Sequence, residues 1–147
     1  MEHEQLTARI IGCAMLVHRT LGAGFLDSVY QNALANELRG MGLLVEREKR
    51  IQVRYRNVVV GDFCADLLID SRVLIEPKAV RSLTPAHEVQ LVNYLTATGI
   101  EVGLLLNFGS ERLEVRRKTR TYRAKTSRQD EHDEQEDGLG RSSATIP

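Results

Sequence analysis

Residues 64–78 read CADLLIDSRVLIEPK, and this stretch decides both the fold and the candidate site. Two apolar runs of strand length flank a short polar connection, which predicts two strands joined by a tight turn. Three charged residues interrupt the apolar pattern, namely Asp66, Glu76 and Lys78. Charges inside a sheet cost free energy unless they are paired or bind a metal ion. These three residues are therefore the first candidates for a functional site.

The register of the two strands decides whether the three charges share one face. Glu76 and Lys78 are two residues apart in one strand, so their side chains point to the same face. A two-residue turn would pair Asp66 with Ile75 and send the carboxylate to the opposite face. A three-residue turn at residues 70–72 would pair Asp66 with Glu76, with their Cβ atoms about 5 Å apart. We predict the three-residue turn.

Two carboxylates this close repel each other and favour a divalent cation between them. Mg²⁺ prefers oxygen ligands and is the predicted ion, with Mn²⁺ as a substitute. Lys78 beside them would stabilise charge on a phosphate group, or orient or deprotonate an attacking water. The spacing leaves a second interpretation open, which is a buried ion pair between the acids and Lys78 that has no activity.

The flanking sequence predicts a small α/β domain with the element order α-α-β-β-β-α-β-β. Apolar residues recur at helical spacing before the deciding stretch, and a glycine-rich turn separates the first two helices. Thr84 is the predicted N-cap of the third helix, which ends before Gly99. The expected helices cover residues 5–21, 26–41 and 85–98, and the expected strands cover residues 44–55, 58–69, 73–79, 102–108 and 113–115. The sheet is expected to be mixed and flanked by helices.

The chain has 147 residues, of which 42% are hydrophobic and 27% charged, as in an ordinary globular domain. The domain is expected to cover residues 1–117. Residues 118–147 have few large apolar side chains, which predicts a charged, disordered tail. A basic run from Arg116 to Arg128 suggests contact with nucleic-acid phosphates, with Tyr122 available for base stacking. The acidic block that follows could instead pair with this basic run.

Other features of the sequence argue against several classes of protein. Cys13 and Cys64 have no zinc-ligand spacing and are expected to be reduced core residues. The N-terminal segment is amphipathic rather than continuously apolar, and no apolar run approaches the ~20 residues that span a bilayer. A cytoplasmic protein without a membrane partner is therefore expected. No feature of the sequence indicates an oligomeric state.

Residues 65–78 resemble the signature of the PD-(D/E)XK nuclease superfamily, and residues 5–116 resemble one branch of it, the GxxExxY family. The supporting stretches are residues 11–18, 21–24, 28–30, 33–34, 37–38, 83–88 and 104–108. The resemblance implies a restriction-endonuclease-like core and a Mg²⁺-dependent nuclease, which hydrolyses phosphodiester bonds through a metal-activated water. Nucleic acid would be its partner. No base-reading module is visible, so sequence preference is not expected.

The resemblance also implies roles for individual residues. Asp66 and Glu76 would be metal ligands, and Lys78 would be the catalytic lysine. Gln90 and Tyr94 match the Gln-x-x-x-Tyr helix of related exonuclease domains, where they help to hold the substrate or the active-site lysine. Their spacing places both on one face of a helix. The alternative is a half-buried helix face without a catalytic role.

The chain departs from the family pattern at two positions. The namesake motif falls at residues 24–30, where Asp27 replaces the expected glutamate. Asp27 either reaches the metal ion from the second helix or caps the start of that helix. Pro77 removes a hydrogen-bond donor from a central strand. These departures support an alternative function, a degenerate nuclease fold that binds nucleic acid or another protein. His18 is expected to be structural or to reach the site, and His87 to be exposed or to cap a helix.

Overall fold

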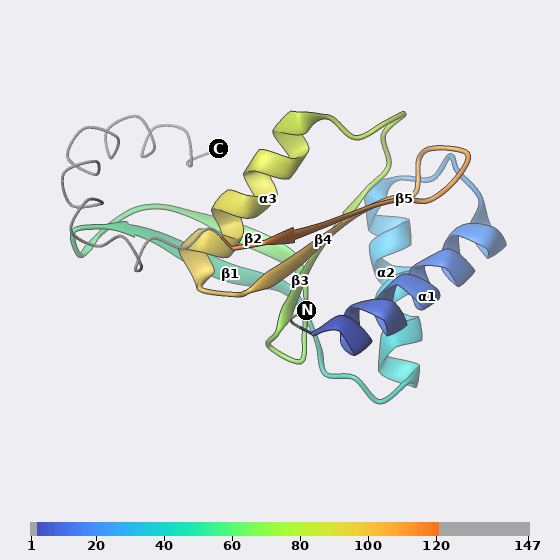
Figure 1. Cartoon of the computed structure of the whole chain (residues 1–147), viewed down its shortest axis with the longest axis horizontal. Helices are drawn as coiled ribbons and strands as arrows, with labels where there is room; N and C mark the ends of the chain where they lie inside the picture. The colour runs from blue at the N-terminus through green and yellow to red at the C-terminus, as the bar shows by residue number, and fades with distance from the viewer. Residues whose placement is uncertain (1–2, 121–147) are drawn as a thin grey trace.

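The computed structural model describes residues 3–120, which form a sheet flanked by helices (Figure 1). The elements are α1 (Glu4–Leu21), α2 (Asp27–Gly40), β1 (Val45–Tyr55), β2 (Val58–Ile69), β3 (Val73–Lys78), α3 (Pro85–Thr98), β4 (Val102–Asn107) and β5 (Glu114–Thr119). The strands lie in the order β1-β2-β3-β4-β5, and only the β3–β4 pair is parallel. This arrangement confirms the predicted α/β fold with its mixed, restriction-endonuclease-like sheet.

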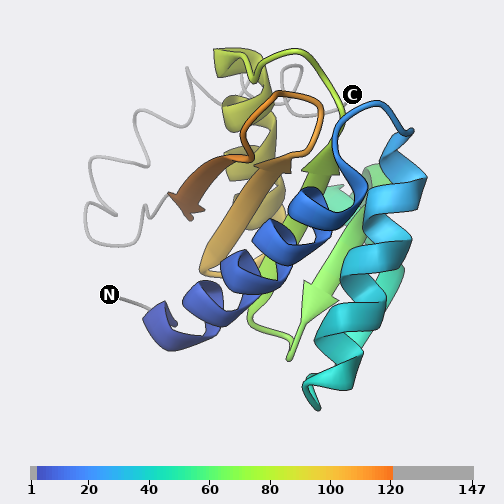
Figure 2. The same ribbon diagram turned by 90° about the vertical axis from the view of Figure 1, so that its right-hand side faces the viewer.

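The helices form two layers on opposite faces of the sheet (Figure 2). In β3, Val73 and Ile75 pack against α1 and α2, whereas Leu74 packs against α3. Strands β3 and β4 are almost entirely buried because helices cover both of their faces. The prediction that residues 102–108 form a strand buried on both faces is confirmed. Among residues 3–120, no helix combines the length and the apolar character that crossing a membrane requires.

The connection between β2 and β3 is the predicted three-residue turn. Ile69 pairs with Val73, and the amide of Arg72 donates a hydrogen bond to the carbonyl oxygen of Ile69 at 2.9 Å. Asp70 takes a φ of 52°, and its carboxylate accepts a hydrogen bond from the amide of Leu44 at 2.8 Å. Aspartate tolerates this left-handed conformation better than most residues. The side chain that sets the turn is therefore held by the neighbouring chain segment.

This turn fixes the register on which the candidate site depends. Leu67 of β2 pairs with Ile75 of β3. One step further along the same register, Asp66 would lie opposite Glu76, as the three-residue turn predicted, although the pairing of β2 with β3 ends at Leu67 and Ile75. The charge of Asp66 raises the pKa of Glu76, so the two carboxylates lie near each other.

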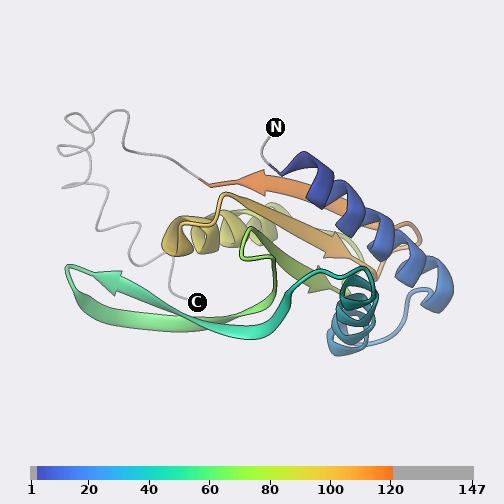
Figure 3. The same cartoon turned by 90° about the horizontal axis from the view of Figure 1, so that it is seen from below.

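The β1–β2 hairpin extends well beyond the rest of the sheet (Figure 3). β2 pairs with β3 only over residues 67–69, but it pairs with β1 along nearly its whole length. A shift of register between Val53 and Arg54 marks a bulge, which increases the local twist of a hairpin. The two turn residues, Arg56 and Asn57, both have positive φ angles, of 51° and 68°.

Both ends of α3 follow the predicted signals. Thr84 is the N-cap and Pro85 is the first helical residue. The amide of Thr84 donates a hydrogen bond to Nδ1 of His87 at 3.0 Å, so His87 has the capping role that was one of its two expected roles. Gly99 ends the helix with a φ of 78°, in the left-handed region that favours glycine.

Three expectations differ from the structure in detail. β5 continues to Thr119, four residues beyond the expected end of the last strand at residue 115, because it pairs with β4 as far as Val102. Cys64 is exposed, since its neighbours in β2 turn toward α3 and Cys64 alternates away. Leu26 is the N-cap of α2 rather than part of its apolar face, and it is 77% exposed. Tyr122 and the rest of the expected tail lie outside the described residues.

Candidate functional site

Glu76 and Lys78 lie side by side at the end of β3, as their spacing predicted. The carboxylate oxygen Oε1 of Glu76 is 3.8 Å from Nζ of Lys78. Both side chains are largely shielded from solvent, with exposures of 8% for Glu76 and 22% for Lys78. Lys78 is thus a half-buried cation beside a buried acid, and Asp66 faces them from β2.

The electrostatics of Glu76 show that the local positive charge does not balance the acids. The pKa of Glu76 is raised to about 7, first by burial and then by the charge of Asp66, against the lowering effect of Lys78. The pKa of Asp66 is also raised, first by burial and then by the carboxylates of Asp27 and Glu48, while Lys78 opposes the rise. An additional cation at this position would relieve the repulsion between these acids.

Asp27 contributes a third carboxylate from another layer of the fold. It is the first residue of α2, and its side chain makes no capping hydrogen bond. Its charge raises the pKa of both Asp66 and Glu76. Asp27 therefore acts electrostatically on both acids of the sheet, and its role as a metal ligand or a helix cap stays a prediction.

The alternation of side chains along β2 is interrupted at Asp66. This irregularity exposes the carboxylate to the neighbouring helices. Residues two apart share one face of a regular strand. Ala65 nevertheless packs beside α3, whereas Leu67 packs beneath α1 and α2. Glu48 lies opposite Asp66 in β1, between the regular pairs, and has a φ of 52°. The twist at this level places Asp66 at the point where both helical layers meet the sheet.

Gln31 supports this part of β2 and is a residue that the sequence analysis missed. It is only 7% exposed. Its Nε2 donates a hydrogen bond to the backbone oxygen of Asp66 at 3.3 Å. Gln31 lies one helical turn after Asp27, so the two residues share a face of α2. No pattern in the sequence singled it out, because its burial depends on how α2 packs against β2.

Tyr94 of α3 lies close to the site, and Gln90 lies one turn before it. The ring of Tyr94 stacks on Phe63 with a centroid distance of 3.8 Å. Its pKa is raised by burial first and then by the charges of Glu76 and Asp66. Gln90 is partly buried and makes no hydrogen bond to another residue within the described range 3–120. The structure thus relates Tyr94 electrostatically to the acids and leaves the amide of Gln90 available.

The segment that follows Lys78 is fixed by a buried asparagine, which sequence reasoning did not single out. Asn107 is fully buried at the end of β4. Its Oδ1 accepts hydrogen bonds from the amides of Val80 at 2.9 Å and Gly109 at 3.0 Å. Its Nδ2 donates to Oε1 of Glu114 at 2.7 Å. A polar residue that ends an apolar strand was the signal in the sequence.

Gly109 allows the two loops at this end of the sheet to approach closely. A Cβ atom at Gly109 would lie 2.4 Å from the carbonyl oxygen of Val80, a distance that backbone atoms cannot accommodate. The amide of Phe108 also donates a hydrogen bond to the carbonyl oxygen of Lys78 at 2.8 Å. The backbone on either side of the Lys78 side chain is therefore held by β4 and the loop after it.

Pro77 destabilises the sheet less than its position in a central strand suggested. The carbonyl of Lys78 points to β4, so the backbone nitrogen of Pro77 points to the other neighbour, β2. At the level of Pro77, β2 and β3 no longer pair, because the last pair before this level is Leu67 with Ile75. The donor that proline lacks faces a place where the strands have separated, so no ladder hydrogen bond is lost.

His18 makes structural contacts with the end of β4 and the loop that follows it. Its Nε2 is 3.0 Å from the carbonyl oxygen of Ser110, and its ring lies against Phe108. These contacts connect α1 to the loop after β4. They match the structural role expected for His18.

The donor atoms of the site fit a hard, oxygen-binding cation. Within the described residues, no three His, Cys, Asp or Glu side chains are close enough to form a complete metal centre. Among the described residues, the buried carboxyl group of Glu76 has Lys78 as its ion-pair partner, at 3.8 Å. The carboxylate oxygens of Glu76 and Asp66 are the kind of ligand that suits a hard divalent cation.

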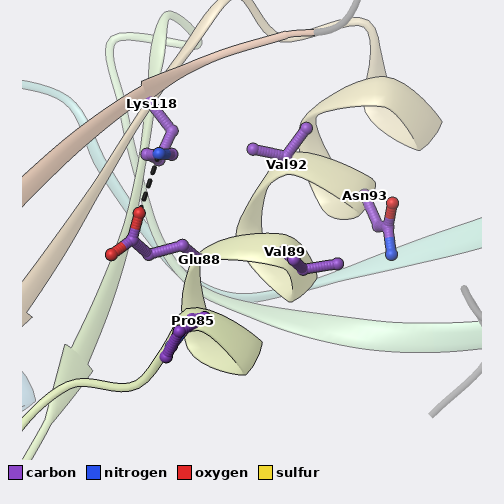
Figure 4. A pocket seen from close by; sticks show the side chains of 6 residues that line it. All are labelled: Pro85, Glu88, Val89, Val92, Asn93 and Lys118. Atoms are coloured by element: carbon purple, nitrogen blue, oxygen red, sulfur yellow. Dashed lines mark hydrogen bonds and ion pairs between the residues drawn. The ribbon is translucent and has the colours of Figure 1, made fainter.

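A separate shallow groove lies on the outer side of α3 (Figure 4). It is lined by Pro85, Glu88, Val89, Val92, Asn93 and Lys118. Nζ of Lys118 contacts Oε1 of Glu88 at 2.8 Å, so the charges in this groove are already paired. None of the site residues described above lines it, and the groove is distinct from the candidate site.

One of the comparisons with known proteins identifies the superfamily of the chain. No curated protein matches the chain. The solved structure titled "Crystal structure of SSO0001" shares 24% identity and a TM-score of 0.49, over 67% of this chain and 52% of that chain. This chain thus spans about half of the length of that protein. The narrower resemblance to the GxxExxY family stays a prediction. Residues 4–118 match the model of the PD-(D/E)XK nuclease superfamily, and the chain belongs to that superfamily.

Proposed function

We propose that the protein is a Mg²⁺-dependent nuclease that hydrolyses phosphodiester bonds in nucleic acid. The observation that carries the proposal is the buried acid Glu76, 3.8 Å from Lys78, with the half-buried Asp66 near enough for its charge to act on Glu76. Burial raises the pKa of both acids, the charge of Asp66 raises that of Glu76 further, and the charges of Asp27 and Glu48 raise that of Asp66, which is the condition of a site that a cation completes. Membership of a nuclease superfamily supports the same chemistry.

In this proposal Asp66 and Glu76 hold Mg²⁺, or Mn²⁺ in its place, and Asp27 acts directly or through a water. The ion would activate a water and neutralise charge on the phosphate. The ammonium group of Lys78 stabilises the negative charge that develops on the phosphate oxygens, and orients the attacking water. Gln90 and Tyr94 hold the substrate or Lys78 from the same face of α3.

A second candidate function is a degenerate nuclease fold that only binds nucleic acid or another protein. The shorter side chain of Asp27 favours it, because a carboxylate with less reach weakens a metal site. Pro77 no longer supports this alternative, since the missing donor lies beyond the β2–β3 ladder. The nuclease function is therefore the better supported of the two.

The direct test is cleavage of labelled single- and double-stranded DNA and RNA with Mg²⁺ or Mn²⁺. We expect cleavage by the wild type and a loss of at least a hundredfold in Lys78→Ala, the range for removing one stabilising charge. Lys118→Ala is the matched control, because Lys118 pairs with Glu88 away from the site.

Three other results would change the assignment. Equal cleavage by the wild type and Lys78→Ala would mean a contaminating nuclease. Salt-sensitive DNA binding without cleavage would favour the degenerate fold. A rise in melting temperature with Mg²⁺ that persists in Asp66→Ala would remove Asp66 from the metal site.

A further inference from the structure

The outer half of the β1–β2 hairpin is a two-stranded ribbon with both edges open. Followed from Leu67 toward its N-terminal end, β2 no longer pairs with β3, but it continues to pair with β1 as far as Val58. The inner part of the ribbon packs against α3 through Ile51, Val53 and Phe63, and its tip extends beyond the helices and the other strands (Figures 1 and 3). It begins at Asp66, so any molecule that contacts the ribbon is held in a fixed relation to the candidate site.

The excess of positive charge lies in the outer part of the ribbon. Residues 49–62 contain four cationic side chains and a single carboxylate, Asp62. The acids Glu48 and Asp66 lie at the inner end, where Lys49 also pairs with Glu46 at 3.1 Å. Arg50 pairs with Asp62 at 2.9 Å, but their side chains are 70% and 48% exposed. An ion pair this exposed contributes little and is readily exchanged for another anion.

The two arginines nearest the tip have no acidic partner among the described residues. Arg54 donates hydrogen bonds to the side chain of Gln52 at 3.1 Å and the carbonyl oxygen of Asn57 at 3.5 Å. The guanidinium of Arg56 lies over the ring of Tyr55, 5.4 Å from its centroid. Both cations keep donors available for phosphate oxygens.

The tip also exposes apolar side chains next to these cations. Tyr55 is 44% exposed and Val58 is 59% exposed, and the next two residues of β2 are valines that are 43% exposed each. Cations mixed with an aromatic ring and small apolar groups suit a partner that offers phosphates beside base edges and methyl groups. A second copy of the ribbon would place the unpaired arginines against each other and is disfavoured by repulsion.

We propose that the β1–β2 hairpin is a DNA-binding arm whose tip enters the major groove of the duplex that the site cleaves. This inference rests on the proposed nuclease function and adds the substrate class, which is duplex DNA. The major groove of B-form DNA is about 12 Å wide and admits a two-stranded ribbon. The major groove of duplex RNA is deep and narrow and does not.

The length of the arm sets where it touches the duplex. The chain from Asp66 to Val58 is extended throughout. At about 3.3 Å per residue the tip reaches roughly 26 Å from Asp66. This distance corresponds to about eight base pairs at roughly 3.4 Å each. The arm therefore needs a duplex that continues about eight base pairs beyond the cleaved phosphate.

The test is the affinity of the full chain for a 24-base-pair DNA duplex at several salt concentrations, by fluorescence anisotropy in EDTA. The variant is Arg54→Glu/Arg56→Glu, and the charge-matched control is Arg9→Glu/Arg19→Glu on α1, where both arginines are exposed. We expect at least a tenfold loss of affinity in the tip variant, with a salt slope lower by about 2, since two phosphate contacts are lost. The control should lose less than about threefold.

Several outcomes would contradict the proposal that the hairpin is a DNA-binding arm. Equal affinities of the tip variant and the control would overturn it, provided that both melt at the wild-type temperature. A wild-type dimer that Tyr55→Ser converts to a monomer, with unchanged DNA affinity, would make the tip a self-association surface. Equal dependence on the tip for duplex RNA would overturn the major-groove assignment. Because binding is measured without metal, these outcomes are independent of whether the wild type cleaves.

Discussion

At the scale of single residues, Glu76 is a position where burial opposes the ionisation of a carboxyl group. The folded chain keeps a carboxyl group almost out of solvent, 3.8 Å from one lysine and across from a second acid. Its pKa of about 7 means that near neutral pH the proton and a divalent cation compete for the same oxygens. Occupancy of the site by metal should therefore increase as the pH rises through 7.

The same pKa shift makes the metal-free protein more stable in mild acid. The unfolded chain releases the Glu76 proton near pH 4.5, and the folded chain keeps it to about pH 7. The free energy of unfolding should therefore fall as the pH rises through this window, by roughly 1–3 kcal/mol. Urea unfolding in EDTA at pH 5 and pH 8 measures the difference.

Glu76→Gln should remove most of this pH dependence and be more stable than the wild type at pH 8 in EDTA. The control is Glu88→Gln, because the pKa of Glu88 is lowered by its hydrogen bond to Lys118, so this residue contributes with the opposite sign. An unchanged pH dependence in Glu76→Gln would show that other groups are responsible.

The sequence predicted the acids of the sheet better than the residues that surround them. Asp66 and Glu76 stood out because each breaks an apolar strand, and the turn between them fixes their register. Gln31 and Glu48 come from elements whose approach depends on packing and on a twist at one residue. Periodicity carries no information on such contacts, so these two residues were visible only in the structure.

At the scale of elements, the end of β4 and the loop after β3 behave as one unit. The side chain of Asn107 satisfies two backbone amides and one carboxylate without access to solvent. Glu114 also accepts a hydrogen bond from the amide of Leu83 at 3.0 Å. The loop that leads from Lys78 to α3 is therefore tied to two strands at once.

Asn107→Ala should destabilise the fold by about 2–4 kcal/mol, because it leaves buried amides of Val80 and Gly109 without an acceptor. Asn93→Ala is the control, since Asn93 lies on the open groove of α3, and it should change stability by less than about 0.5 kcal/mol. Chemical denaturation of both variants measures the difference. A loss below about 1 kcal/mol in Asn107→Ala would mean that the loop is held by its other contacts.

Element boundaries were predictable where a local signal marks them. Thr84, Pro85 and Gly99 delimit α3 as expected because capping depends on neighbouring residues. The end of β5 was missed by four residues, since its last residues are polar and their strand conformation comes from pairing with β4 as far as Val102. Pairing partners lie far away in the sequence, and their influence cannot be seen in a local pattern.

At the scale of the whole molecule, we predict that the domain includes all of β5 and ends near residue 120. Thr119 pairs with Val102, and the amide of Arg120 donates a hydrogen bond to the carbonyl oxygen of Glu101 at 2.9 Å. A chain that ends at residue 120 should melt within about 2 °C of the full chain. A chain that ends at residue 117 loses these hydrogen bonds at an edge strand and should melt several degrees lower. Equal melting of the two shortened chains would place the end of the domain at residue 117.

The single parallel pair in the sheet has a consequence for the order of folding. β2 and β3 are joined by three residues and can meet early, whereas β3 reaches β4 only after the crossover through α3 has formed. Asp66 and Glu76 are thus brought together before the second neighbour of β3 and the helix above it exclude water. The free energy needed to bury Glu76 as an anion is therefore spent late in folding, when β4 docks. If this docking limits the rate, protonation of Glu76 should speed refolding.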